Sequence, residues 1–109
     1  MKLGLFGGTF DPIHNGHLSM AAAFADELAL DQVVFIPAGD PYHKSVATRT
    51  PAAKRLAMVE AAISGDVRFA ASDIDMVREG ATYTVDTSQI LRQYYPNAEI
   101  WWLMGMDSL

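Results

Sequence analysis

The stretch from Gly7 to His17 constrains this chain most strongly, because it joins a short apolar run to an alanine-rich pattern with helical spacing. Its glycines let the backbone approach a ligand closely, and Pro12 limits how the following turn can move. His14 and His17 stand at the predicted start of the helix, where free backbone N–H groups and the helix dipole favour an anion. The stretch predicts a phosphate site, against the alternative of an ordinary strand-to-helix turn with solvated histidines.

The rest of the chain alternates short apolar runs with amphipathic stretches. Strands are predicted over residues 3–6, 33–36, 67–71 and 98–104, and helices over residues 15–29, 51–63 and 85–95. Thr50 is expected to cap the second helix and Gly65 to end it. Because a strand, a helix and a parallel strand form a right-handed crossover, the pattern predicts an α/β fold, a Rossmann-like open parallel sheet with helices on both faces.

In a sheet of this kind, ligands bind beyond the carboxyl ends of the strands. Four segments follow predicted strands and can line one cleft: Gly7–His17, the exposed loop with His43 and Lys44, the turn with Tyr83 and Thr84, and Gly105–Asp107. Trp101 and Trp102 are adjacent in a strand and therefore face opposite sides, so we interpret both as core residues rather than as a stacking platform.

Composition excludes several classes of function. The 109 residues have room for about one domain, and 8 Lys+Arg against 13 Asp+Glu give a net charge of −5 without a basic run, so the footprint of a nucleic-acid-binding protein is absent. The count of 0 cysteines excludes disulfides, thiolate zinc sites and cysteine nucleophiles. No apolar run reaches transmembrane length, and the apolar start is too short for a signal peptide, so we expect no membrane partner and a cytoplasmic protein.

With these residues placed, the chain resembles the nicotinate-nucleotide adenylyltransferases of the HxGH nucleotidyltransferase α/β superfamily along its whole length. Residues 7–18 match the family's GGTFDPxHxGHL motif, and residues 37–44 resemble its PxxxPxHK loop. Residues 83–87 resemble its (S/T)YTxDT segment, and residues 103–109 resemble its (I/L)xGxDxL strand end. The resemblance implies adenylyl transfer from ATP to nicotinate mononucleotide, which gives deamido-NAD and pyrophosphate on the route to NAD.

The resemblance also implies roles for single residues. His14 and His17 would contact the ATP phosphates and stabilise the transition state of an in-line attack, in which positioning and charge stabilisation supply the rate. The other implied ATP contacts are Gly7, Gly8, Thr9, Phe10, Lys44, Gly105 and Asp107, and the implied nicotinate mononucleotide contacts are Thr9, Phe10, His43, Lys44, Tyr83 and Thr84. Mg²⁺ is expected as the counter-ion of ATP, without a dedicated protein site.

Some of these residues also have a plain structural interpretation. A lysine in a loop, such as Lys44, is usually just solvated. Tyr83 and Thr84 can cap a helix, and Asp107 can do the same for a following one. Neither interpretation is excluded by the residues alone.

Members of the family continue to an ISSTxxR motif that brings an arginine and hydroxyls to the triphosphate, and no residues here match it. We therefore expect residues 1–109 to be an incomplete domain, truncated before its last strand and C-terminal helices, with weak nucleotide binding and poor turnover. An apolar sheet edge beside residues 100–104 would then favour a homodimer. The alternatives are a sibling adenylyltransferase for nicotinamide mononucleotide or another phosphate acceptor, a non-catalytic nucleotide-binding remnant and, last, a CheY-like or flavodoxin-like domain.

Overall fold

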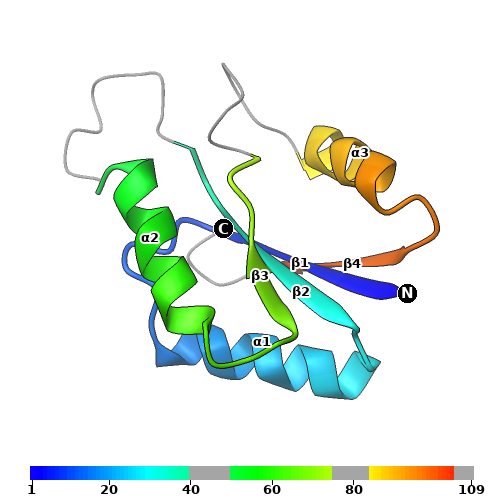
Figure 1. Cartoon of the computed structure of the whole chain (residues 1–109), viewed down its shortest axis with the longest axis horizontal. Helices are drawn as coiled ribbons and strands as arrows, with labels where there is room; N and C mark the ends of the chain where they lie inside the picture. Colours follow the sequence, from blue (N-terminus) through cyan, green and yellow to red (C-terminus); the bar gives the residue numbers. More distant parts are fainter. Residues whose placement is uncertain (40–49, 75–83, 105–109) are drawn as a thin grey trace.

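The computed structural model describes residues 1–39, 50–74 and 84–104, except for the side chains of residues 84–88 and 104. Strands and helices alternate along this part of the chain, as the sequence predicts (Figure 1). The elements are β1 (Lys2–Gly8), α1 (Asn15–Leu28), β2 (Gln32–Pro37), α2 (Ala52–Ile63), β3 (Phe69–Ala71), α3 (Thr84–Tyr94) and β4 (Glu99–Met104).

The strands form one parallel sheet in the order β3-β2-β1-β4, which confirms the predicted open α/β architecture. Leu3 of β1 is in register with Gln32 of β2 on one side and with Ile100 of β4 on the other. The chain moves outward from β1 to β2 and β3 and then crosses back over to β4. The direction of the connections therefore reverses at β1, which places the switch point of the sheet between β1 and β4.

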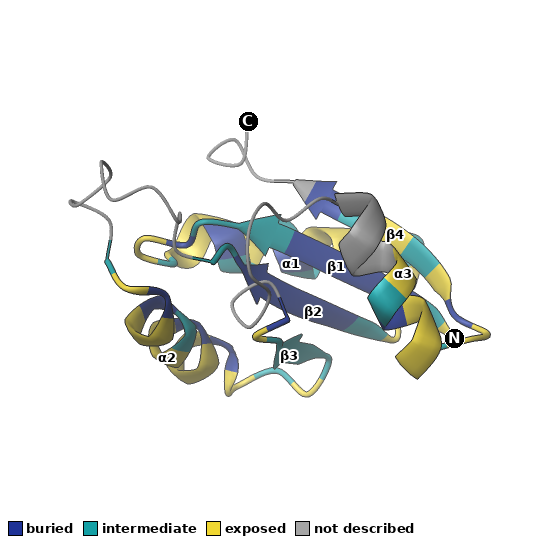
Figure 2. Ribbon diagram, turned by 90° about the horizontal axis from the view of Figure 1, so that it is seen from above, coloured by how far each residue is buried: buried dark blue, intermediate teal, exposed yellow. Residues whose placement is uncertain are grey.

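Helices cover both faces of the sheet, α1 and α2 on one face and α3 on the other (Figure 1). Alternate residues of a strand point to opposite faces, so Phe6 packs in the core under α1 and α2 while Leu3 and Leu5 pack under α3. Both sets are fully buried. Figure 2 shows β1 and β2 largely buried, and helices whose outer surfaces are exposed. Because β1 lies between β2 and β4, its carboxyl end is in the interior of the sheet edge.

Two predicted features of α2 are wrong. Its N-cap is Pro51, which makes no side-chain capping hydrogen bond, whereas the N–H of Thr50 donates to the Asp11 carboxylate at 2.9 Å. Thr50 is thus used to hold another segment rather than to cap its own helix. The helix ends through Ser64, which has an ordinary right-handed conformation and donates its hydroxyl to Ala61 O at 3.0 Å, so Gly65 is not needed as a left-handed cap.

Two other predictions fail at the sides of the sheet. β3 is shorter than predicted because Asp66 and Arg68 form a turn before it, in which the Phe69 N–H donates to Asp66 O at 3.1 Å and Val67 is fully exposed. Trp102 packs against the core under α3, as predicted. Trp101 is 39% exposed, because β4 is an outer strand among those that the structure describes.

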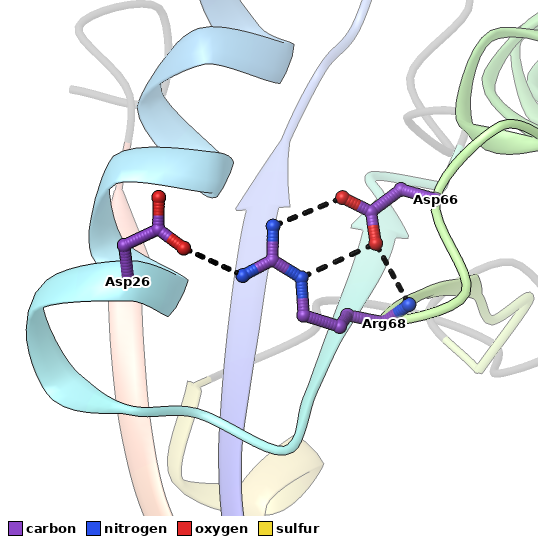
Figure 3. Close-up of polar contacts among 3 residues, drawn as sticks. All are labelled: Asp26, Asp66 and Arg68. Atoms are coloured by element: carbon purple, nitrogen blue, oxygen red, sulfur yellow. Dashed lines mark hydrogen bonds and ion pairs between the residues drawn. The ribbon is translucent and has the colours of Figure 1, made fainter.

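The amino end of the sheet is held by charged groups that are at least partly exposed. Arg68 donates to the carboxylate of Asp26 on α1 at 2.8 Å and to that of Asp66 at 3.0 Å (Figure 3). The hydrogen bonds from Arg68 hold the pKa of Asp66 below its ordinary value, and the bonds to Asp66 and Asp26 raise the pKa of Arg68. Lys2 adds a further connection, since its Nζ donates to Leu28 O at the end of α1 at 3.2 Å.

The described helices include none that is both long and apolar enough to cross a membrane.

Candidate functional site

His14 is the N-cap of α1, at the carboxyl end of the sheet. Its backbone is extended, with φ −141° and ψ 176°, and its Nδ1 accepts the N–H of Gly16 at 3.0 Å. In return, Nδ1 of His17 accepts the N–H of His14 at 3.1 Å. The two histidines thus form a reciprocal capping box, in which imidazoles replace the usual hydroxyl and carboxylate.

These hydrogen bonds assign the tautomer of both rings. A ring nitrogen that accepts an N–H carries no proton of its own, so in the neutral form both imidazoles are protonated at Nε2. Each ring therefore carries its N–H at Nε2, the nitrogen that does not accept the capping hydrogen bond. At a helix N-terminus, where backbone N–H groups also face outward, such donors can bind an anion.

The two rings lie stacked, with centroids 3.9 Å apart and an interplanar angle of 32°. His17 is 5% exposed and packs edge-on against Phe10, at 5.0 Å between centroids, and more distantly against Phe6. His14 is exposed. The inner imidazole is consequently held by the core under α1 and α2, and it fixes the orientation of the outer one.

Gly16 is required by this arrangement. A Cβ at position 16 would lie 2.8 Å from Cε1 and 2.9 Å from Nδ1 of His14, closer than real Cβ contacts allow. The glycine between the histidines therefore leaves room for the His14 ring to fold back onto the helix end.

Gly7 and Gly8 belong to β1 rather than to the turn after it, which corrects the sequence interpretation. Gly7 is in register with Ile36 and Gly8 with Pro37, so both continue the ladder with β2. A Cβ at Gly7 would approach the Trp102 ring to 3.3 Å. At position 7 the small residue thus makes space for a ring of the neighbouring strand β4.

The strained backbone position of the turn is Phe10, with φ 49°, in the left-handed region that favours glycine. Its ring is fully buried and packs against Phe6 and Phe35 at 5.3 and 5.7 Å between centroids. The Phe6 ring lies 5.3 Å from each of the other two. Burial of the aromatic ring holds the backbone in this conformation. The peptide bond between Asp11 and Pro12 is cis.

Arg55 of α2 and Thr50, which precedes that helix, hold the turn, and the sequence assigned neither of them to the site. The fully buried Arg55 donates from Nη1 to Thr9 O at 2.8 Å and from Nε to Thr50 O at 2.7 Å. Asp11 accepts the Thr50 N–H, as described above. The available signal was the spacing of Ala52, Arg55 and Val59 along one face of the helix, which the charge of the arginine obscured.

The structure brings together part of the predicted site. The predicted site residues that lie at or just after the carboxyl end of β1 are Gly7, Gly8, Thr9, Phe10, His14 and His17. Thr84 is the first residue of α3, but its side chain is outside the described residues. His43, Lys44, Tyr83, Gly105 and Asp107 also lie outside them.

A family comparison now decides the class of protein. Residues 5–109 match the model of the cytidylyltransferase-like family. The chain belongs to this family.

Relatives within the cytidylyltransferase-like family are close. A probable nicotinate-nucleotide adenylyltransferase of Neisseria meningitidis serogroup C (strain 053442) is 69% identical over 108 residues, which are 99% of this chain and 54% of that protein. One of Thermomicrobium roseum with the same name is 52% identical over 99% of this chain and 50% of its own length. The chain spans about half the length of the curated relatives it matches.

A solved structure supports the fold. The Plasmodium falciparum nicotinic acid mononucleotide adenylyltransferase complexed with NaAD superimposes with a TM-score of 0.75 at 18% identity, over 93% of this chain and 50% of that one. The same protein complexed with APC gives a TM-score of 0.73 at 16% identity, over 93% of this chain and 49% of that one. At these identities the match establishes the cytidylyltransferase-like fold alone.

Proposed function

We propose that the protein transfers the adenylyl group of ATP to nicotinate mononucleotide, which forms deamido-NAD and releases pyrophosphate. The observation that carries the proposal is the stacked pair His14 and His17 at the N-terminus of α1, with both Nδ1 atoms occupied by backbone N–H groups. Two Nε2–H donors at the switch point of a parallel sheet suit a phosphate chain. The reaction is taken from the name of the relative that is 69% identical.

The chemistry needs no protein nucleophile. A phosphate oxygen of the mononucleotide attacks the α-phosphorus of ATP in line, the bond to the bridging oxygen breaks, and pyrophosphate leaves with the electron pair. His14 and His17 would donate to the phosphate oxygens on which charge develops, where a preorganised donor lowers the barrier. The backbone of Gly7, Gly8, Thr9 and Phe10 would border the two nucleotides at the end of β1.

The remaining roles stay predictions. Lys44, Gly105 and Asp107 are proposed to contact ATP, and His43, Lys44, Tyr83 and Thr84 the mononucleotide, at least in part through its pyridine carboxylate. Mg²⁺ bound with ATP would neutralise part of the triphosphate charge. Among the described residues no group of three His, Cys, Asp or Glu is placed to hold a metal ion, so no protein ligand is assigned to it.

The test uses the chain in two forms, alone and joined to the remaining part of the Neisseria meningitidis relative in place of the aligned 108 residues. Pyrophosphate release is measured with ATP and either nicotinate or nicotinamide mononucleotide. We expect turnover by the joined form with nicotinate mononucleotide and much weaker turnover by the chain alone. A joined form that folds but releases no pyrophosphate would contradict the proposal, and equal rates with both mononucleotides would remove the substrate assignment.

Two further properties belong to the proposal. A cytoplasmic location fits the count of 0 cysteines, because reducing compartments do not favour disulfides.

A homodimer through β4 fits the exposed Trp101 on an outer strand. Light scattering at increasing concentration measures this, and Trp101→Lys is expected to weaken any dimer; a monomer at all concentrations would contradict the pairing.

A further inference from the structure

Arg55 is a fully buried charged residue on the inner face of α2. A charged group inside a protein needs hydrogen-bond partners, because leaving it without them is costly. Its hydrogen-bond partners include the carbonyl of Thr9, directly after β1, and the carbonyl of Thr50, directly before Pro51 and α2. One planar guanidinium thus connects the turn that leads to His14 with the segment that leads into α2.

The hydrogen bond from Arg55 to Thr9 O also fixes the orientation of the peptide group between Thr9 and Phe10. In a planar trans peptide the N–H points away from the C=O, so anchoring Thr9 O sets the direction of the Phe10 N–H. Phe10 is left-handed and is fixed by its buried ring, and Asp11 is fixed by the Thr50 N–H. Three successive residues are therefore anchored by three different contacts, and Thr50 is bonded both to Asp11 and to Arg55.

We propose that Arg55 is a positioning residue for nucleotide binding, which holds the turn from Thr9 to Asp11 in the shape that places it beside His14 and His17. This inference rests on the proposed function. Arg55 does not touch the ligand, because it is fully buried. Without its hold on Thr9, the strained backbone at Phe10 can relax and displace the turn, and a displacement of about 1 Å can cost about 100-fold in rate.

The test compares Arg55→Met, Arg55→Lys and the control Lys54→Met in the joined form. Lys54 is the exposed neighbour of Arg55 on α2, so its substitution removes the same charge without touching the turn. Calorimetry with ATP gives the affinity of the folded fraction, and steady-state kinetics separate KM from kcat. Thermal unfolding, measured in parallel, ensures that each titration is made well below the midpoint.

We expect Arg55→Met to weaken ATP binding about 10-fold or more, with a partial recovery in Arg55→Lys, because a lysine reaches one carbonyl at a time. Lys54→Met should stay within about 2-fold of the wild type. If Arg55→Met does not fold, then Arg55→Lys and Asp11→Ala decide, since Asp11 is exposed and its removal breaks the hydrogen bond from the Thr50 N–H to the turn. Variants that lose stability but keep the wild-type affinity and kcat would overturn the positioning role.

A second measurement does not depend on the proposed reaction. The amide resonance of Phe10 reports on the peptide group that Arg55 holds, and it should shift in Arg55→Met and stay in place in Lys54→Met. A wild type that binds neither ATP nor mononucleotide would refute the proposed function. The Phe10 resonance would still test whether Arg55 holds the peptide group between Thr9 and Phe10. An unchanged Phe10 resonance in Arg55→Met would overturn it.

Discussion

The two ends of the sheet are each held by an arginine, and the two arginines are held in different ways. At the amino end, the partly exposed Arg68 connects two carboxylates, one on α1 and one in the turn before β3 (Figure 3). At the carboxyl end, the buried Arg55 connects two backbone carbonyls. The first arginine holds elements together through side chains, whereas the second holds the backbone that borders the candidate site.

The two arginines therefore have different roles. Arg55 holds the backbone beside the candidate site in one shape, whereas Arg68 only adds stability to the fold. Exposed ion pairs are weak and screened by salt, because water solvates both partners well. A buried donor to a backbone carbonyl has no water to compete with, and its loss leaves polar groups without partners. We therefore expect substitutions at the carboxyl end to change nucleotide chemistry and those at the amino end to change stability slightly.

The largest effect is expected at His14. His14→Ala removes both the cap and the Nε2 donor, whereas His14→Asn keeps a good N-cap and loses only the donor. Both variants should lose turnover by about 10²–10³-fold. Only His14→Ala should also lose stability, by about 1 kcal/mol in urea unfolding. Normal pyrophosphate release by His14→Asn would reduce His14 to a helix cap.

The arginines themselves give the next largest difference. Arg55→Met leaves the carbonyls of Thr9 and Thr50 without their donor, so we expect a loss of about 2–4 kcal/mol in unfolding free energy. Arg68→Met should shift the urea midpoint only slightly, because the side chain is partly exposed. Fluorescence of the two tryptophans follows both transitions. Equal losses in the two variants would break the contrast between the two ends.

Alanine substitutions of glycines at the two ends should have contrasting effects, a loss of turnover at Gly16 and a gain of stability at Gly65. Gly16→Ala places a Cβ within 3 Å of the His14 ring and should lower turnover about 10-fold by displacing it. Gly65→Ala meets nothing within 4 Å near the amino end, and it should stabilise the protein by about 0.4–1 kcal/mol. Kinetics and urea unfolding of both variants test this, and full turnover by Gly16→Ala would contradict the role given to the imidazole orientation.

The smallest expected effect is a dependence of stability on pH at the amino end. Arg68 keeps the pKa of Asp66 below its ordinary value of 3.8. The stabilisation from this pair is thus fully present above about pH 4 and is lost as the pH falls through the lower pKa of the folded state. Unfolding free energies of wild type and Arg68→Met should converge toward pH 2. Curves that stay parallel down to that pH would show that the pair does not stabilise the fold.

Local patterns were enough to predict most of the fold. Apolar runs predict the strands, and helical spacing places His14 and His17 at the start of α1, whereas their capping hydrogen bonds come from the structure. The contacts that hold the turn join residues 39 and 46 positions apart, Asp11 with Thr50 and Thr9 with Arg55, and no local period encodes them. The left-handed position of the turn is Phe10, which is held there by its buried ring, and no local pattern marks it.

The pairing of β1 with β4 has a consequence for the order of folding. β1 pairs on its second side with a strand that is distant along the chain, since Lys2 is in register with Glu99. Contacts this distant form slowly, because the entropy of closing a long loop is lost before they contribute. The β1–α1–β2 unit can assemble early, and the switch point beside Gly7 is completed only when β4 docks. Nucleotide affinity would then report on the docking of β4 rather than on the formation of the β1–α1–β2 unit.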